Sequence, residues 1–250
     1  MSAQRRFADP WPSRQPNWPA APWLMAGTVL TAWFQLPREQ IEALISRSLV
    51  PESGELGPSR LRFYELDYYP DGPDADAHTG GRFREAVVAF PATFNGTVGE
   101  ISAHMWSDDD TYMHWGRDLF GWPILRAPVQ LSGPIWSGEI ESGATGHASV
   151  ELAEGSRAAI SVDGIGARLP APTPAAWITP RLIASPLDEQ RELLVVRPNL
   201  LDPGHRFAVT GDVELAFREP HPLANLSPTA TRIEMSVGFT LRVGDQVERL

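Results

Sequence analysis

The chain has 250 residues, and 42% of them are hydrophobic, which is enough to bury one substantial core. All 21 basic side chains are arginine, so no lysine side chain can form a Schiff base, and the absence of cysteine excludes disulfides and thiolate chemistry. A net charge of -10 repels nucleic-acid phosphates and anionic membrane surfaces. We therefore expect neither a nucleic-acid partner nor a membrane partner.

The first 22 residues predict an arm that precedes the domain. They contain prolines at positions 10, 12, 16, 19 and 22, together with Trp11 and Trp18. Proline resists regular structure, whereas tryptophan provides large apolar anchors. We expect this arm to lie over the domain or over a neighbouring subunit, with a disordered tail as the alternative. Residues 23–250 are expected to form a single domain.

From Gly27 onward, short runs of β-branched and aromatic residues alternate with turn-forming residues, a pattern typical of a mainly β protein. Strands are predicted at Thr28–Phe34, Leu61–Tyr69, Ala86–Phe90, Gly99–Trp106, Val129–Trp136, His147–Leu152, Ala158–Val162, Leu193–Arg197, Phe207–Phe217 and Thr231–Arg242.

Two segments predict helices. Pro37–Ser48 has Ile41, Leu44 and Ile45 on one helical face, with a proline suited to the first turn. The second helix begins at the acidic cluster that starts with Asp108 and continues to Phe120, before glycine and proline end it.

Many short strands with few helices favour a β-barrel or sandwich, because closure removes exposed strand edges. A barrel of sufficient width also encloses a ligand cavity. No apolar run reaches the roughly 20 residues of a membrane-spanning helix, and the N-terminus lacks the apolar run of a secretion signal. We therefore expect a cytoplasmic protein.

The middle of the chain resembles the acetoacetate decarboxylase family. The resemblance rests on Phe94-Asn95-Gly96, His104-Met105, Gly116-Arg117-Asp118 and Gly121-Trp122-Pro123, with Arg82-Phe83-Arg84-Glu85 upstream. It covers most of the chain from about Gly27. The resemblance implies an antiparallel β-barrel that encloses a cavity, a few flanking helices and a homo-oligomer.

In that family, two lysines follow the aromatic-proline step, and the first forms a Schiff base with the substrate ketone. Here the two positions are Ile124 and Leu125. The resemblance thus implies the scaffold of a decarboxylase without its covalent catalyst. We expect Ile124, Leu125, Trp122 and Met105 to line an apolar substrate site.

Glu85 is the first catalytic candidate, because it matches a pocket glutamate of the family. If its side chain faces inward, burial raises its pKa and suits it to general acid or base catalysis. A surface glutamate paired with Arg82 or Arg84 is the alternative. Tyr64, near the position of an acidic pocket residue of the family, could donate a hydrogen bond to a carbonyl oxygen.

His104 is the second catalytic candidate, since histidine titrates near neutral pH. Strict alternation along the strand would put it on one face with Glu100, Ser102 and Trp106. A histidine that is only hydrogen-bonded in the structure is the alternative. Arg117 is a further substrate-binding candidate, although its triplet favours a role in organising the second helix.

No cofactor is expected. The trio His104, Asp108 and His114 matches no recognised metal spacing, so no metal site is predicted. The chain also lacks GxSxG, GxGxxG and Walker motifs. Pro, Gly and Asp are frequent in Tyr69–Gly81, which makes this segment the best candidate for a mobile lid.

These features predict a noncovalent acid-base enzyme that acts on a small molecule containing a carbonyl group. Cyclisation, dehydration or enolisation of a β-keto or polyketide-type intermediate of specialised metabolism would suit such a site. Two alternatives stay open: a noncatalytic protein that binds a hydrophobic small molecule on the same barrel, and a decarboxylase that works without an imine.

Overall fold

The structure of the chain is a computed structural model that describes residues 11–13, 22–51, 56–71, 80–137, 140–152, 154–184, 189–244 and 247–249. The strands are β1 (Trp11–Ser13), β2 (Trp23–Gln35), β3 (Ser59–Pro70), β4 (Gly81–Phe94), β5 (Thr97–Ser107), β6 (Ile124–Arg126), β7 (Val129–Ser132), β8 (Gly146–Glu151), β9 (Arg157–Leu169), β10 (Ala176–Ala184), β11 (Glu189–Val196), β12 (Asn199–Asp202), β13 (His205–Ala216), β14 (Thr229–Val243) and β15 (Val247–Arg249). The helices are α1 (Arg38–Leu44) and α2 (Asp110–Phe120), and short 3-10 turns cover Arg47–Leu49 and Pro134–Trp136.

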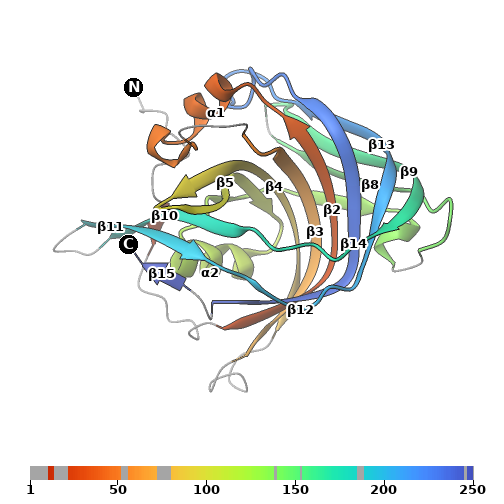
Figure 1. Cartoon of the computed structure of the whole chain (residues 1–250), viewed down its shortest axis with the longest axis horizontal. Helices are drawn as coiled ribbons and strands as arrows, with labels where there is room; N and C mark the ends of the chain where they lie inside the picture. Colours follow the sequence, from red (N-terminus) through yellow and green to blue (C-terminus); the bar gives the residue numbers. More distant parts are fainter. Residues whose placement is uncertain are drawn as a thin grey trace.

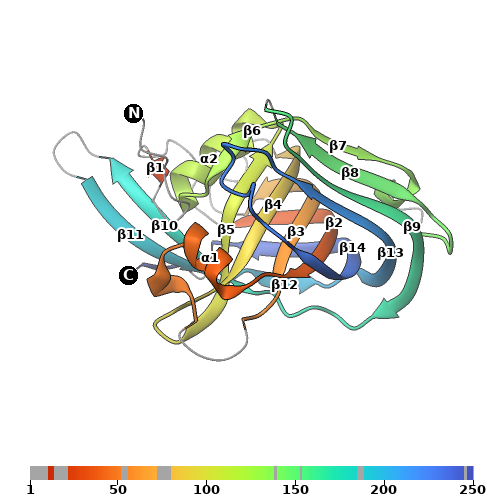
Figure 2. The ribbon, with the colours of Figure 1, turned by 90° about the horizontal axis from the view of Figure 1, so that it is seen from above.

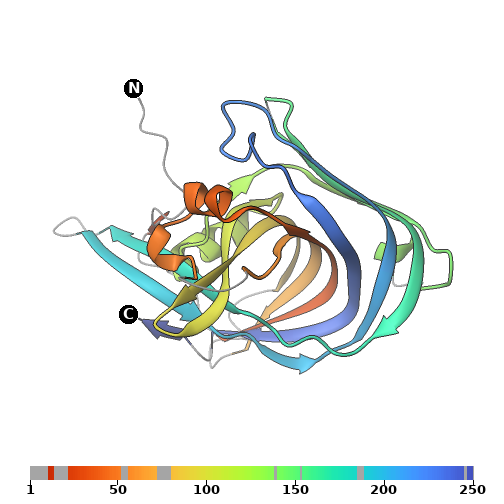
Figure 3. The same cartoon turned by 45° about the horizontal axis from the view of Figure 1, so that its top comes forward.

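The described strands form one curved sheet in the order β15-β11-β10-β5-β4-β3-β2-β14-β13-β9-β8-β7. Outside this order, β1 pairs with β10, β6 pairs with β5 and β12 pairs with β14. Figure 1 shows β2, β3, β4 and β14 bending around an interior, and Figure 3 shows the sheet as a deep arc. Most pairs are antiparallel, but β10 pairs in parallel with β1 and β5, and β5 pairs in parallel with β6. The prediction of a mainly β, barrel-like fold is therefore confirmed.

Alternation along the central strands separates two cores. Leu30, Phe63, Val88 and Trp106 belong to the larger core, which extends to β7, β8 and β9. Met25, Leu66, Phe83 and Met105 belong to the smaller core, which also contains buried side chains of α2 and β11. Figure 2 shows the central strands running side by side between α2 and the β7–β9 region. The candidate site lies on the face of the smaller core.

The two predicted helices are present. Helix α1 buries Ile41 and Leu44, as its apolar spacing predicts. Helix α2 begins after Asp109, whose side chain accepts a hydrogen bond from the backbone N–H of Tyr112 at 2.6 Å. It ends at Gly121, which adopts the left-handed conformation with φ 68° that glycine tolerates best.

Each predicted strand overlaps an observed strand, but sequence reasoning missed β1, β6, β10, β12 and β15. Within β10, Pro180 lies opposite Leu193 of β11. Proline disfavours a central strand, because it lacks an N–H group for the ladder. Among the described residues, the other side of β10 pairs only at 176–177 and 181–183, so Pro180 interrupts no pairing there. The predicted strand Val129–Trp136 ends at Ser132 and continues as a 3-10 turn.

Part of the predicted arm is described. Trp11–Ser13 form β1, which pairs with β10 of the same chain. Most other residues of the arm, and residues 72–79 of the predicted lid, lie outside the described residues. Within the described part of the chain, no helix is long and apolar enough to cross a membrane.

Candidate functional site

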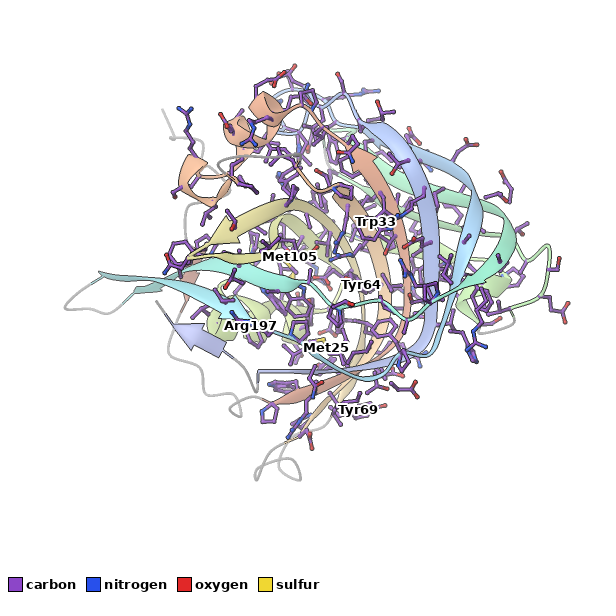
Figure 4. All side chains as sticks on the ribbon, in the orientation of Figure 1. Met25, Trp33, Tyr64, Tyr69, Met105 and Arg197 are labelled. Atoms are coloured by element: carbon purple, nitrogen blue, oxygen red, sulfur yellow. The ribbon has the colours of Figure 1, made fainter. Side chains whose placement is uncertain are left out.

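Two adjoining cavities open on the concave face of the central strands. The outer cavity has a volume of about 240 Å³ and the inner cavity about 40 Å³. Arg62, Tyr64, Trp177 and Leu241 line both of them. The two cavities therefore share part of their wall. Figure 4 shows Tyr64, Met105 and Met25 inside the curved sheet and Tyr69 at its far end.

The pairing of the strands arranges the site in rows across the sheet. One row contains Tyr64 of β3 opposite Glu85 of β4. A second row contains Arg62, and a third contains Arg60 with Trp33 of β2 beside it. Residues two apart on a strand share a face, so Arg60, Arg62 and Tyr64 of β3 form a continuous polar stripe along the cavity.

Glu85 lies in the inner cavity and is 4% exposed. The hydroxyl of Tyr112 donates a hydrogen bond to its Oε1 at 2.7 Å. Burial raises the pKa of Glu85 to about 8, although the hydrogen bond from Tyr112 and the charge of Arg62 act to lower it. At neutral pH this carboxyl group is therefore mostly protonated, and a minority is available as a base.

Tyr112 comes from the first turn of α2, which its bond to the Asp109 cap holds in place. Its ring stacks on Phe83 with centroids 3.6 Å apart. Burial and then the charge of Glu85 raise the pKa of Tyr112 well above its ordinary value, so its hydroxyl remains a donor. The sequence does not predict the contact of this tyrosine with Glu85, because nothing in the spacing joins α2 to β4.

Tyr64 lies beside Glu85 and lines both cavities. Burial raises its pKa to about 12, against the lowering effect of Arg62. Its hydroxyl also accepts a hydrogen bond from the Arg62 side chain. That bond leaves the tyrosine O–H free to point elsewhere, which suits it to donate to a ligand oxygen.

Glu100 of β5 holds two arginines at the border of the cavities. Arg62 binds it with both terminal nitrogens, at 2.5 and 2.7 Å, and Arg60 binds it at 2.6 Å. Burial acts to raise the pKa of Glu100, but Arg62 and Arg60 outweigh it, so the pKa lies below its ordinary value. The ionised glutamate thus fixes the position of both guanidinium groups.

A second carboxylate, Glu234 of β14, organises another part of the outer cavity wall. It accepts hydrogen bonds from Arg206 at 2.6 Å and from the indole N–H of Trp33 at 2.8 Å, and it pairs with Arg232 at 3.0 Å. The guanidinium groups of Arg60 and Arg232 lie 4.1 and 4.3 Å from the Trp33 ring. Sequence reasoning proposed none of these residues.

His104 does not join Glu85 in either cavity. A β-bulge makes Ala103 an extra residue, since Val88 pairs with His104 and Ala89 pairs with Ser102. The bulge reverses the alternation of β5, so Ser102 and Met105 face the inner cavity while His104 stacks on Trp106, 5.3 Å between centroids. The expectation that Ser102 and His104 share a face was wrong, because strict alternation does not allow for a bulge.

The other predicted substrate-binding residues lie at different depths. Met105 and Trp122 line the inner cavity. Ile124 is fully buried in the smaller core beneath it and lines neither described cavity, whereas Leu125 is 41% exposed. Adjacent residues of β6 point to opposite sides, which explains why the pair does not act together. Arg117 donates to the backbone carbonyl of Ile124 and so connects α2 to β6.

Among the described residues, no three histidine, aspartate or glutamate side chains gather closely enough to hold a metal ion. The ionisable groups that face the two cavities are carboxyl, phenol and guanidinium groups, and hydroxyl and indole groups such as those of Ser102, Ser236 and Trp33 also line them. They can exchange protons, donate hydrogen bonds and bind anions. The site therefore offers acid-base chemistry and anion recognition from its own side chains.

Several solved structures share this fold. The enduracididine biosynthesis enzyme MppR, in complex with the condensation product of pyruvate and imidazole 4-carboxaldehyde, is 14% identical with a TM-score of 0.72, over 93% of this chain and 90% of that one. An acetoacetate decarboxylase-like enzyme from Sphingomonas wittichii RW1 is 18% identical with a TM-score of 0.71, over 93% of this chain and 94% of that one. The acetoacetate decarboxylase of Legionella pneumophila is 14% identical with a TM-score of 0.68, over 94% of this chain and 91% of that one.

No curated protein sequence matches the chain significantly. The sequence model of the acetoacetate decarboxylase family matches residues 8–244, which is most of the chain. The fold, the cavity and this match agree, and the chain belongs to the acetoacetate decarboxylase family.

Proposed function

We propose that this protein is a noncovalent acid-base enzyme that uses Glu85 to move protons on a small molecule containing a carbonyl group. The observation that carries the proposal is the buried Glu85 carboxyl group, with a pKa of about 8, at the end of a cavity. A pKa near the working pH suits a group that must both accept and donate protons. The absence of lysine from the sequence excludes a lysine Schiff base.

In this proposal, the carbonyl oxygen of the substrate accepts a hydrogen bond from Tyr64. Ionised Glu85 removes a proton from the carbon next to the carbonyl, and the electron pair of that C–H bond forms the enolate. Tyr64 stabilises the negative charge that develops on the enolate oxygen. Its hydroxyl needs no reorientation, because the hydrogen bond from Arg62 already holds it in place. Tyr112 keeps Glu85 in position and stabilises its ionised form.

The enolate then has three outcomes. Transfer of the proton from Glu85 to the enolate oxygen completes an enolisation, and its return to carbon restores the ketone. Loss of a β-hydroxyl group, to which Glu85 gives the proton it took, releases water and forms a C=C bond. Attack of the enolate carbon on a second carbonyl of the same molecule closes a ring, and the alkoxide that forms takes the proton held by Glu85. The last two reactions fit a role in specialised metabolism, which is the setting of the structural relative MppR by its description.

The cavity favours a more polar substrate than the apolar site predicted from the sequence would bind. Apolar side chains such as Val29, Leu200 and Phe239 line the outer cavity, but arginine and glutamate side chains face it too. Its volume of about 240 Å³ is below the range of about 300–1,000 Å³ that is typical of sites for drug-sized ligands. A small, amphipathic substrate therefore suits the cavity.

Exchange of solvent deuterium into a panel of ketones and β-keto acids, followed by NMR, tests the proposal without knowledge of the natural substrate. The native protein should exchange α-protons of at least one panel member, with a rate that rises with pH and levels off above about 8. Glu85→Gln should lose the exchange while it stays folded. Equal exchange by both proteins would assign the proton transfer to another group.

The substrate itself can be found by metabolite profiling of the source organism without this gene. Complementation with the native sequence should consume the accumulated precursor, and complementation with Glu85→Gln should not.

Noncatalytic binding is the second candidate, and the apolar lining of the outer cavity favours it. Leu241 lines both cavities, so Leu241→Trp fills them. A binding protein should lose its ligand with this variant and keep it with Glu85→Gln. Full restoration of the metabolite profile by Glu85→Gln would favour binding over catalysis.

A further inference from the structure

The outer cavity contains a cluster of arginines, and the proposed acid-base chemistry uses only one of them, Arg62. We call Arg60, Arg62 and Arg206 the arginine rim; all three line the outer cavity. Their side chains are only 22%, 11% and 15% exposed, respectively. Figure 4 shows Trp33, which adjoins the rim, on the same concave side of the sheet as Tyr64.

Guanidinium groups outnumber carboxylates at the rim. Glu100 is shared by Arg60 and Arg62, and Glu234 binds Arg206 while it also pairs with Arg232. Two carboxylates therefore compensate the three rim arginines together with Arg232, whose side chain is 53% exposed, in a chain whose net charge is -10. A local excess of buried positive charge in an acidic protein attracts an anion and is stabilised by it.

Arg60 lines the outer cavity, and its guanidinium group carries more N–H donors than its described hydrogen bond to Glu100 uses. Its Nη1 donates to Glu100, while the guanidinium lies over the Trp33 ring. Burial lowers the pKa of Arg60 to about 10, against the raising effect of Glu100. Glu100 thus offsets only part of the cost of burying the positive charge of Arg60. A ligand carboxylate would stabilise this charge further through charge-assisted hydrogen bonds.

Arg60 lies at a distance from the proton-transfer residues, whereas Arg62 donates a hydrogen bond to Tyr64. Arg60 precedes Tyr64 by four residues on β3, and the strand rises roughly 3.3 Å per residue, so their backbones are about 13 Å apart. Burial, Tyr112 and Arg62 account for the pKa of Glu85, and Arg60 is not among the causes. An anion at Arg60 therefore lies several bonds away from a carbonyl at Tyr64.

We propose that the arginine rim binds a carboxylate at the end of the substrate opposite its reacting carbonyl, so that the substrate is an oxo acid with an apolar spacer between the two groups. This inference rests on the proposed function for the position of the carbonyl only. The apolar side chains between rim and Glu85 contact the spacer. This carboxylate anchors the substrate and does not react.

A carboxylate suits the rim better than a phosphate dianion. Glu100 and Glu234 remain at the rim and repel a second negative charge on the ligand. Planar guanidinium groups also match a planar carboxylate with two parallel hydrogen bonds.

Calorimetric titration tests the proposal with three probes: a linear methyl ketone with a carboxylate at its far end, the methyl ester of that acid, and acetoacetate. The titrations use Glu85→Gln, so that no reaction consumes the probe. Because binding is measured without turnover, the rim can be confirmed even if native protein fails to exchange protons.

The long oxo acid should bind at least about tenfold more tightly than its ester, as expected for charge-assisted hydrogen bonds. Adding Arg60→Met or Arg206→Met should remove most of that preference and leave the affinity for the ester within about twofold. Each variant keeps an arginine on each glutamate, which protects folding. Arg126→Met, an exposed arginine on β6, is the matched control and should keep the preference.

Equal affinity for acid and ester, or a preference that survives both rim variants, would overturn the proposal. A preference for acetoacetate that depends on Arg60 would also overturn it, because the carboxylate would then lie beside the carbonyl. Increased salt should weaken the binding of the acid more than the binding of the ester, since salt screens the contact between the carboxylate and the arginines.

Discussion

Glu85 and His104 occupy neighbouring strands and are both almost completely buried, yet their environments differ. Glu85 faces a cavity and has a tyrosine hydroxyl, a tyrosine neighbour and an arginine around it. His104 faces the larger core and stacks among Trp106 and His221. Burial favours the neutral form of both groups, but of the two only Glu85 lines one of the two described cavities. Burial of a titratable group is therefore not sufficient for a catalytic role, because the group must also lie on the face of the sheet that lines the cavities.

The largest expected effect separates the two residues by activity. Glu85→Gln should lower α-proton exchange by about 100- to 10,000-fold, which is the usual contribution of one general base. His104→Leu should keep the exchange rate within about threefold, because its side chain does not face the cavities. Rates from both variants, with folding checked by circular dichroism, test this. A His104→Leu protein that folds but does not exchange would return His104 to the site.

The pH dependence of stability should have opposite signs for the two groups. Burial raises the pKa of Glu85 from 4.5 to about 8, so its contribution is full below pH 4.5 and is lost as pH rises to about 8. Burial, and then His221, lower the pKa of His104 well below 6.5, so the folded state loses stability as pH falls below 6.5.

Urea unfolding across pH measures both slopes. Glu85→Gln should flatten the decline between pH 4.5 and 8, a change of a few kcal/mol at the alkaline end, and His104→Leu should flatten the decline below pH 6.5. Identical pH profiles for native protein and both variants would contradict the assigned environments.

The sequence predicted the scaffold better than the site. Strong alternation and the resemblance were sufficient for the β-rich fold and for the inward position of Glu85 at a cavity, while its catalytic role stays a prediction. The rim was missed, although Arg60, Arg62 and Tyr64 alternate with the buried Leu61 and Phe63 and could have indicated a polar stripe on one face of β3.

The partners of that stripe could not be found from spacing. Glu100, Arg206 and Glu234 come from strands far apart in the chain, and only the sheet order brings them together. The bulge at Ala103 likewise depends on the pairing of β4 with β5 rather than on local residue pattern.

A smaller effect is expected from Tyr112→Phe, which sharpens the account of Glu85. The phenylalanine keeps the stacking on Phe83 but removes the hydrogen bond that lowers the pKa of Glu85. The pKa should therefore rise further, and exchange at pH 7 should fall roughly tenfold. The midpoint of the pH-rate profile should move to higher pH. Tyr68→Phe, a tyrosine that also packs on Phe83, is the control and should leave the midpoint unchanged.

The ionisation of Glu85 is the most direct test of the central claim. NMR titration of protein with ¹³C-labelled glutamate side chains, with Glu85→Gln to assign the signal, reports the carboxyl pKa in the folded state. A midpoint of about 8 is the result expected for a buried acid-base catalyst. A midpoint near the ordinary value of 4.5 would show a solvated carboxylate and contradict the account.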